Sequence, residues 1–205
     1  MSKNKPQNKK PGLDLSCWHY FLLLESDFAA AARHLVGTER NDTACSIEFA
    51  KQIVCICTEC EALLKQISQS IFPKNNAANM GHYKRTLLGH YPDIHKAAVL
   101  LRPNQRTLHP FEAWGDSGGR IDWWNAYQDI KYHRDSNFEK ATLKNTLEAL
   151  GALLILELTL YAGIASKGTD TLGGTELLWA PGMPRPEWTP SQETLPHLKT
   201  SAGQN

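Results

Sequence analysis

The feature of the sequence that most constrains the fold is an almost continuously apolar stretch over residues 147–164. It is long enough to suggest a helix that crosses a membrane, but two carboxylates, Glu148 and Glu157, interrupt it. A carboxylate near the centre of a bilayer costs about 2.5–3.5 kcal/mol even on the most lenient insertion scale. We therefore expect this stretch to form the buried core helix of a protein without a membrane span.

The composition excludes several classes of protein. Of the 205 residues, 41% are hydrophobic and 21% are charged, which excludes a wholly disordered chain. The formal net charge of +1 excludes a uniformly basic nucleic-acid-binding protein, although a local basic patch remains open. The five cysteines do not suggest a disulfide scaffold, and no apolar signal region follows the basic residues 1–11. We expect a cytoplasmic protein.

Periodic apolar residues predict helices along most of the chain. Ser46 is a suitable N-cap for one of them, and Pro73 ends it. Proline and glycine interrupt residues 92–119, within which a short strand is expected over residues 98–101. The chain is therefore predicted to be an all-α bundle with a long irregular insertion before the last long helix. The expected helices cover residues 16–36, 46–72, 80–89, a stretch that opens near 122, and 136–165.

Changes in composition divide the chain into three parts. Residues 1–14 form a lysine-rich arm that we expect to be disordered, and residues 15–165 form the helical domain. Residues 166–205 are rich in proline and glycine and are predicted to be a C-terminal tail. Trp179 and Trp188 are expected to hold part of this tail against the domain.

Aromatic and basic residues are densest over residues 122–138, where they suggest contacts with a nucleic acid. Aromatic rings offer stacking faces for bases, worth about 1–3 kcal/mol each, and cations contact phosphates. His133 is a histidine, the residue type whose ordinary pKa suits proton transfer near neutral pH. The alternative is that the rings are core residues and the cations a solvated helix face. The residues concerned are Trp123, Trp124, Tyr127, Lys131, Tyr132, His133 and Arg134.

A continuous helix through this segment would carry two polar stripes. The first would comprise Lys131, Arg134, Asn145 and Glu148, and the second His133, Lys140 and Lys144.

Glu25 lies on the apolar face of the first helix, where a carboxylate is rarely buried unless it is paired. We predict that it meets Arg134 or Lys131 across the bundle. The pair would either support function or only fix the helix register.

Three closely spaced cysteines, Cys55, Cys57 and Cys60, raise the question of a metal site. On a helix, Cys57 and Cys60 share a face that Cys55 does not, and no second Cys/His pair has finger-like spacing. We therefore expect buried thiols that behave as small hydrophobes, with no metal and no cofactor.

The string from Arg85 to His90 places an arginine five residues before a histidine. On an ideal helix these two side chains point roughly 140° apart. We interpret the string as a coincidence or as an accessory phosphate contact.

The segment WWNAYQDIKYHRDSNF resembles a recurrent bacterial pattern, W-x-x-Y-N-x-x-K-H-x-R, followed by F-x-x-A and a long apolar helix. The opening YFLLLESDFAAAARHL, followed by Asn41 and Ser46, resembles the partner segment of the same group, the HEPN-like α-helical proteins. The resemblance covers roughly residues 16–165. It implies an up-and-down bundle of four to five helices, often dimeric, with a polar cleft at the dimer interface.

Active HEPN ribonucleases use an R-x4–6-H motif and, without metal, drive the RNA 2′-hydroxyl onto the adjacent phosphate. In this chain the histidine precedes the arginine, Tyr132 interrupts the Lys-His pair, and Gln128 stands where the group tends to have asparagine.

Two functions follow from these observations. In the first, the protein is a HEPN-like, metal-independent endoribonuclease of a phage-defence or toxin–antitoxin system, silenced by a partner protein. His133 would act as general acid or base, Arg134 and Lys131 would stabilise the phosphorane, and Glu25 would orient a cation. Lys140, Lys144, Trp123 and Trp124 would contact the nucleic acid. The alternative is a non-catalytic helical module that binds RNA, a nucleotide or another protein. We expect a homodimer in either case.

Overall fold

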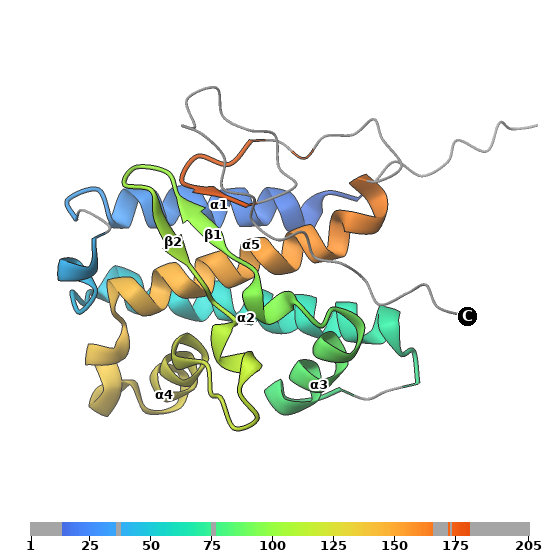
Figure 1. Cartoon of the computed structure of the whole chain (residues 1–205). Helices are drawn as coiled ribbons and strands as arrows, with labels where there is room; N and C mark the ends of the chain where they lie inside the picture. The colour runs from blue at the N-terminus through green and yellow to red at the C-terminus, as the bar shows by residue number, and fades with distance from the viewer. Residues whose placement is uncertain (1–13, 36–37, 75–76, 166–171, 173, 181–205) are drawn as a thin grey trace, which may run out of the picture.

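The computed structural model describes residues 14–35, 38–74, 77–165, 172 and 174–180. Most of these residues are helical, with a small antiparallel sheet on one side (Figure 1). The α-helices are α1 (Ser16–Ala31), α2 (Ile47–Ile71), α3 (Met80–His90), α4 (Asp122–Asn137) and α5 (Leu143–Ala165). The strands are β1 (Val99–Leu101), β2 (Arg106–Leu108) and β3 (Leu178–Trp179). Short 3-10 turns are η1 (Glu39–Asn41), η2 (Ile94–Lys96), η3 (Glu112–Gly115) and η4 (Phe138–Lys140).

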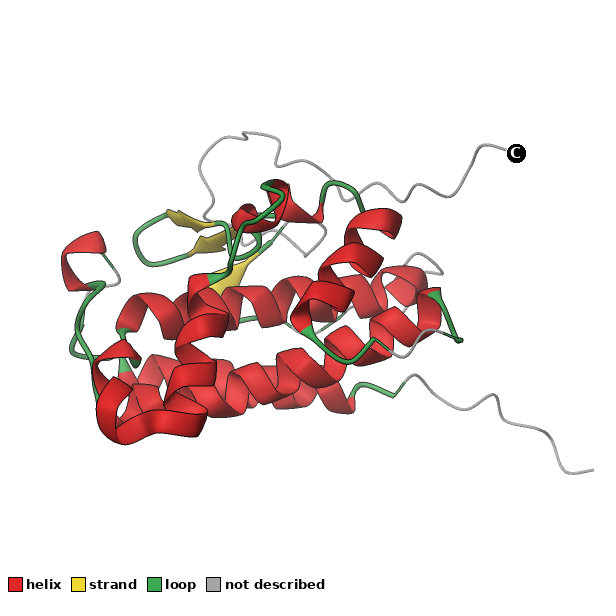
Figure 2. Cartoon of the chain, turned by 90° about the horizontal axis from the view of Figure 1, so that it is seen from below, coloured by secondary structure: helices red, strands yellow, loops and turns green. Residues whose placement is uncertain are grey.

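Helices α2 and α5 form the centre of the fold. They pack along each other, α1 lies against both, α3 packs on α2, and α4 packs on both α2 and α5 (Figures 1 and 2). The predicted N-cap of α2 is confirmed, since the Ser46 hydroxyl accepts a 3.0 Å hydrogen bond from the Phe49 backbone N–H. Asn79 caps α3 in the same way, through His82.

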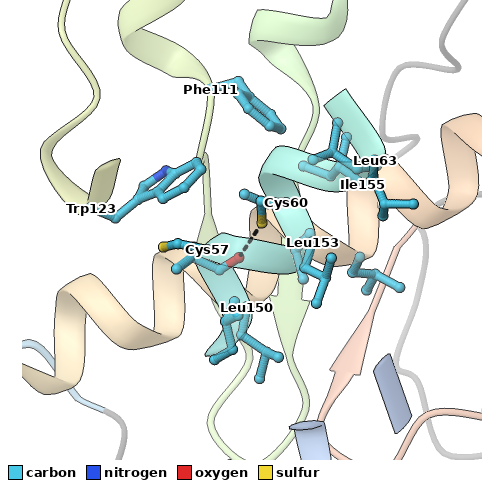
Figure 3. Packing of buried hydrophobic residues seen from close by; sticks show 14 of the residues in the cluster. Cys57, Cys60, Leu63, Phe111, Trp123, Leu150, Leu153 and Ile155 are labelled. Atoms are coloured by element: carbon cyan, nitrogen blue, oxygen red, sulfur yellow. Dashed lines mark hydrogen bonds between the residues drawn. The ribbon is translucent and has the colours of Figure 1, made fainter. Parts of the chain in front are cut away.

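The core is built on the face that α2 turns toward α5. Cys57 and Cys60 are completely buried there, and the Cys60 thiol donates to the carbonyl of Ala149 at 3.7 Å (Figure 3). Leu150 and Leu153 of α5 surround them. The expectation of buried thiols is confirmed for Cys57 and Cys60, whereas Cys55 is only half-buried. Burial raises the pKa of Cys57 and of Cys60 well above its ordinary value.

The prediction of an all-α protein is corrected by the sheet. Its strand order is β2-β1-β3, both pairings are antiparallel, and Leu101 lies opposite Leu178. The strand expected over residues 98–101 is present. Its partner β3 comes from the segment predicted to be a tail, so the expected docking of Trp179 is confirmed. Trp188 and the arm at residues 1–13 lie outside the described residues.

The last long helix does not begin at residue 136 as predicted. Helix α4 ends at Asn137, η4 follows, and α5 starts at Leu143. Thr142 stabilises this start, because its hydroxyl accepts a 3.1 Å hydrogen bond from the backbone N–H of Asn145. Thr142 also forms an isolated bridge to Cys45 before α2. The predicted stripes therefore do not lie on one helix.

Helix α5 is the core helix that its apolar sequence predicts, with almost every side chain over residues 147–161 buried. Glu157 is completely buried on it. No helix among the described residues is long and apolar enough to cross a membrane.

Candidate nucleic-acid interface

The end of α4 carries the predicted catalytic residues. His133 has non-helical backbone angles, φ −144° and ψ 51°, so the helix is kinked at this residue. All six side chains over residues 131–136 are exposed. Tyr132 is 63% exposed, which is unusual for a large aromatic side chain. We call Lys131, Tyr132, His133 and Arg134 the α4-end surface.

Lys131 is held in a defined position on this surface. Its ammonium donates a 2.9 Å hydrogen bond to the Tyr127 hydroxyl. It also lies over two rings, 5.1 Å from the centroid of Tyr127 and 5.4 Å from that of Tyr132. The hydrogen bond from Lys131 to Tyr127 raises the pKa of the ammonium. The structure therefore places a fixed cation beside an exposed ring.

Trp123 and Trp124, which were predicted to contact the nucleic acid, have different environments. Trp123 is buried, and its indole N–H donates to the carbonyl of Pro110 at 2.9 Å, beside Phe111 (Figure 3). Trp124 is half-buried and packs at 5.0 Å from Tyr127. The interpretation of the aromatic residues as core therefore holds for Trp123.

Glu25 lies away from the α4-end surface, so its predicted pairing with Arg134 or Lys131 is wrong. Its carboxylate accepts hydrogen bonds from the backbone N–H groups of Glu176, Leu177 and Leu178, at 2.8, 3.0 and 2.8 Å. Burial raises the pKa of Glu25, an effect that these hydrogen bonds and Arg102 oppose. Glu25 thus fixes the position of β3.

Lys140 and Asn145 belong to the junction between α4 and α5. The Lys140 ammonium pairs with the carboxylate of Asp129 at 2.6 Å. The Asn145 amide donates to the Lys140 carbonyl at 2.9 Å. Lys144 is exposed on the first turn of α5, and its backbone N–H bonds to the carbonyl of Asp42. Lys140 is therefore neutralised by an ion pair, whereas Lys144 faces solvent.

A polar cluster that the sequence did not reveal surrounds Glu148. The chain turns through Gln105, at φ 58°, and Arg106 then forms a two-bond ion pair with Asp42, at 2.6 and 2.9 Å. Burial raises the pKa of Glu148 to about 7, although Arg106 lowers it. The cations that lower the pKa of Glu148 are Arg106 and Lys144, and Arg134 is not among them. No local pattern could have found the pair, because Asp42 follows η1 and Arg106 begins β2, 64 residues further along the chain.

The structure also contains a hollow beside α3. This hollow, of about 300 Å³, lies between the end of α2 and α3, lined by Phe72, His82, Arg85 and Thr86. Within the described ranges, no group of three or more His, Cys, Asp or Glu side chains is arranged to hold a metal ion.

Comparisons of the chain with protein families, curated proteins and solved structures found no match.

Proposed function

We propose that the protein is an RNA-binding helical protein of HEPN-like type whose contact region is the α4-end surface. The observation that carries this proposal is the exposed ring of Tyr132 with the Lys131 ammonium held 5.4 Å from its centroid. A base stacks on such a ring, and the neighbouring cation contacts the phosphate that follows it.

The charges around the surface favour a single-stranded ligand. His133 and Arg134 add to Lys131, but Asp135 and Glu139 are also exposed nearby. A broad basic field, as needed for a duplex backbone, is therefore not formed. Stacking on Tyr132 with a few local phosphate contacts requires unpaired bases, which single-stranded RNA provides.

Binding is tested with a fluorescent single-stranded RNA decamer, by anisotropy. Tyr132→Ala is expected to weaken binding by about 5-fold or more, and Tyr132→Phe to retain it, because stacking needs only the ring. Tyr20→Ala is the matched control, since Tyr20 is also exposed but lies on α1. Equal affinities for Tyr132→Ala and the unaltered protein would refute the proposal.

A second candidate function, metal-independent RNA cleavage, is favoured by the helix kink at His133 and by the exposure of both His133 and Arg134, which are adjacent in the sequence. The imidazole would accept the proton of the 2′-hydroxyl, whose oxygen attacks phosphorus while the bond to the 5′-oxygen breaks. The products are a 2′,3′-cyclic phosphate and a 5′-hydroxyl that takes up a proton. Arg134 would stabilise the phosphorane charge. Glu25 has no part in this scheme.

Cleavage is tested with EDTA present throughout. Cyclic-phosphate ends from the unaltered protein, and none from His133→Ala or Arg134→Ala, would support the enzyme. RNA binding without cleavage would support the non-catalytic module. Homodimerisation, a silencing partner and a role in phage defence remain parts of the proposal that derive from the HEPN-like resemblance.

A further inference from the structure

We propose that the hollow between α2 and α3 binds one nucleotide unit of the same single-stranded RNA, an inference that rests on the proposed function. In this arrangement Phe72 stacks on the base, while Arg85 and His82 contact the phosphate. The residues that line the hollow include one aromatic ring and two side chains with nitrogen donors, and they are Phe72, His82, Arg85 and Thr86.

The aromatic face of the hollow is Phe72, the residue directly after α2. Its backbone N–H donates to the carbonyl of Ser68 at 2.9 Å, so the end of the helix fixes its position. Its side chain is 54% exposed. An exposed phenyl ring at the wall of a hollow offers a stacking face that any base can use.

The anion-binding side of the hollow is formed by α3. Among the described residues, no salt bridge joins Arg85 to a carboxylate, and its side chain is exposed. The Nδ1 atom of His82 accepts from the backbone N–H of Ala78 at 3.5 Å. Nε2 therefore carries the proton in the neutral ring and is a donor. Both side chains are suited to a phosphate oxygen.

The charge of residues 62–92 also favours the binding of an anion. Residues 62–92 contain no aspartate or glutamate, although the whole chain is almost neutral. The same stretch contains Lys65, Lys74, Lys84 and Arg85. Lys84 donates to the carbonyl of Asp116 at 2.6 Å, which anchors the loop before α4 to α3. The segment that forms the end of α2 and the whole of α3 is therefore basic.

Helix α3, which lines the hollow, and helix α4, which carries the α4-end surface, both pack on α2. Glu61 of α2 raises the pKa of both Tyr83 on α3 and Lys131 on α4, although burial is the larger cause for Tyr83 and the hydrogen bond to Tyr127 for Lys131. Helices α3 and α4 lie on the same side of α2 in Figure 1. From Glu61 to Phe72, α2 rises by about 16 Å, which several nucleotides can span. We infer that an RNA strand bound at Tyr132 follows this part of α2 to reach the hollow.

The test compares variants for affinity toward the single-stranded RNA decamer. Arg85→Ala and Phe72→Ala are each expected to weaken binding by about 5-fold or more, whereas Phe72→Tyr retains the stacking face. Arg33→Ala is the matched control, because Arg33 is an exposed arginine that follows α1. Circular dichroism shows whether each variant is folded. Decamer affinities of folded Arg85→Ala and Phe72→Ala equal to that of the unaltered protein overturn the inference.

A second probe, AMP, separates this inference from the proposed function. In amide NMR spectra, AMP is expected to shift the backbone signals of residues 82–86 in the unaltered protein and not in Arg85→Ala. If the decamer does not bind but AMP gives these shifts, the nucleotide site stands and the proposed function fails. If inorganic phosphate reproduces the AMP shifts at equal affinity, Phe72 contributes no base contact and the nucleotide assignment is overturned. Absence of both AMP and decamer binding overturns both proposals.

Discussion

The Glu25 carboxylate accepts a 2.8 Å hydrogen bond from the backbone N–H of Leu178, which lies 153 residues further along the chain. Two more backbone N–H groups, of Glu176 and Leu177, bond to the same carboxylate. A buried carboxylate normally requires a cation, but here three backbone donors bind it directly and Arg102 contributes only a smaller electrostatic effect. The contact joins α1 to β3 and thereby completes the sheet.

Replacing Glu25 by alanine is expected to detach β3. The substitution removes three charge-assisted hydrogen bonds and leaves their donors unsatisfied, so we expect a loss of about 2–4 kcal/mol of unfolding free energy. Hydrogen exchange at the amides of residues 176–178 should accelerate strongly. Asp27→Ala, an exposed acidic residue on the same helix, is the control and should change neither quantity. Unchanged exchange in Glu25→Ala would contradict this role.

Glu157 makes the stability of the protein depend on pH. Burial raises its pKa to about 8, with a smaller contribution from Glu59, and neither carboxylate oxygen has a hydrogen-bond partner in the described structure. The folded protein therefore holds the proton at pH values where the unfolded chain, with a pKa near 4.5, has released it. This contribution to stability is full below about pH 4.5 and is lost as the pH rises through about 8.

The measurement is urea unfolding of the unaltered protein and Glu157→Gln at several pH values across this window. The glutamine variant should lose less stability as the pH rises, because it has no proton to release. Glu148, whose pKa is raised to about 7, contributes in the same direction and remains in both proteins. Parallel stability curves for the two proteins would show that Glu157 does not titrate as described.

Arg106 and Asp42 form a partly buried pair that should couple energetically. Arg106→Ala leaves Asp42 and the nearby Glu148 without their cation, and we expect a loss of about 1–3 kcal/mol. Adding Asp42→Ala should recover part of that loss, since the unpaired carboxylate is then also removed. A double-mutant cycle by urea unfolding measures this coupling. A coupling energy of zero would mean that the pair contributes nothing to stability.

Trp123 and Tyr132 are expected to have different roles: Trp123 stabilises the core, whereas Tyr132 binds RNA. Trp123→Ala should cost about 3–5 kcal/mol of unfolding free energy, because it empties a core position and removes the bond to Pro110. Tyr132→Ala should change stability by about 0.5 kcal/mol or less, since the ring is exposed. Thermal or urea unfolding of both variants checks this. A large destabilisation by Tyr132→Ala would assign a structural role to that ring.

Local patterns in the sequence predict the helices but not how distant segments meet. The N-cap at Ser46 and the proline after Phe72 define α2 almost to the residue, and the apolar run of α5 is buried as expected. The sheet was missed because β3 pairs with β1 from a segment without periodicity, and strand pairing is not a local property. The sequence shows that Glu25 is an unusual residue on an apolar helix face. Its partners cannot be predicted from the sequence, because they are backbone N–H groups, which every residue except proline has.

The candidate site, like the fold, could be predicted from the sequence only in part. Composition alone identifies the aromatic and basic residues near His133. It does not predict the break between α4 and α5. Neither glycine nor proline occurs there. Thr142 and Asn145, which stabilise the junction, are polar residues that also occur within helices. The hollow at Phe72 requires α2 and α3 to pack together, which only the fold reveals.

The central claim, that the α4-end surface binds single-stranded RNA, is tested most directly by photocrosslinking. A decamer containing 4-thiouridine is bound to the unaltered protein, irradiated and mapped by mass spectrometry of the crosslinked peptides. The account predicts crosslinks at Tyr132, with a second set at Phe72 if the hollow takes part. Crosslinks confined to other exposed aromatic residues, such as Tyr20 on α1, would contradict it.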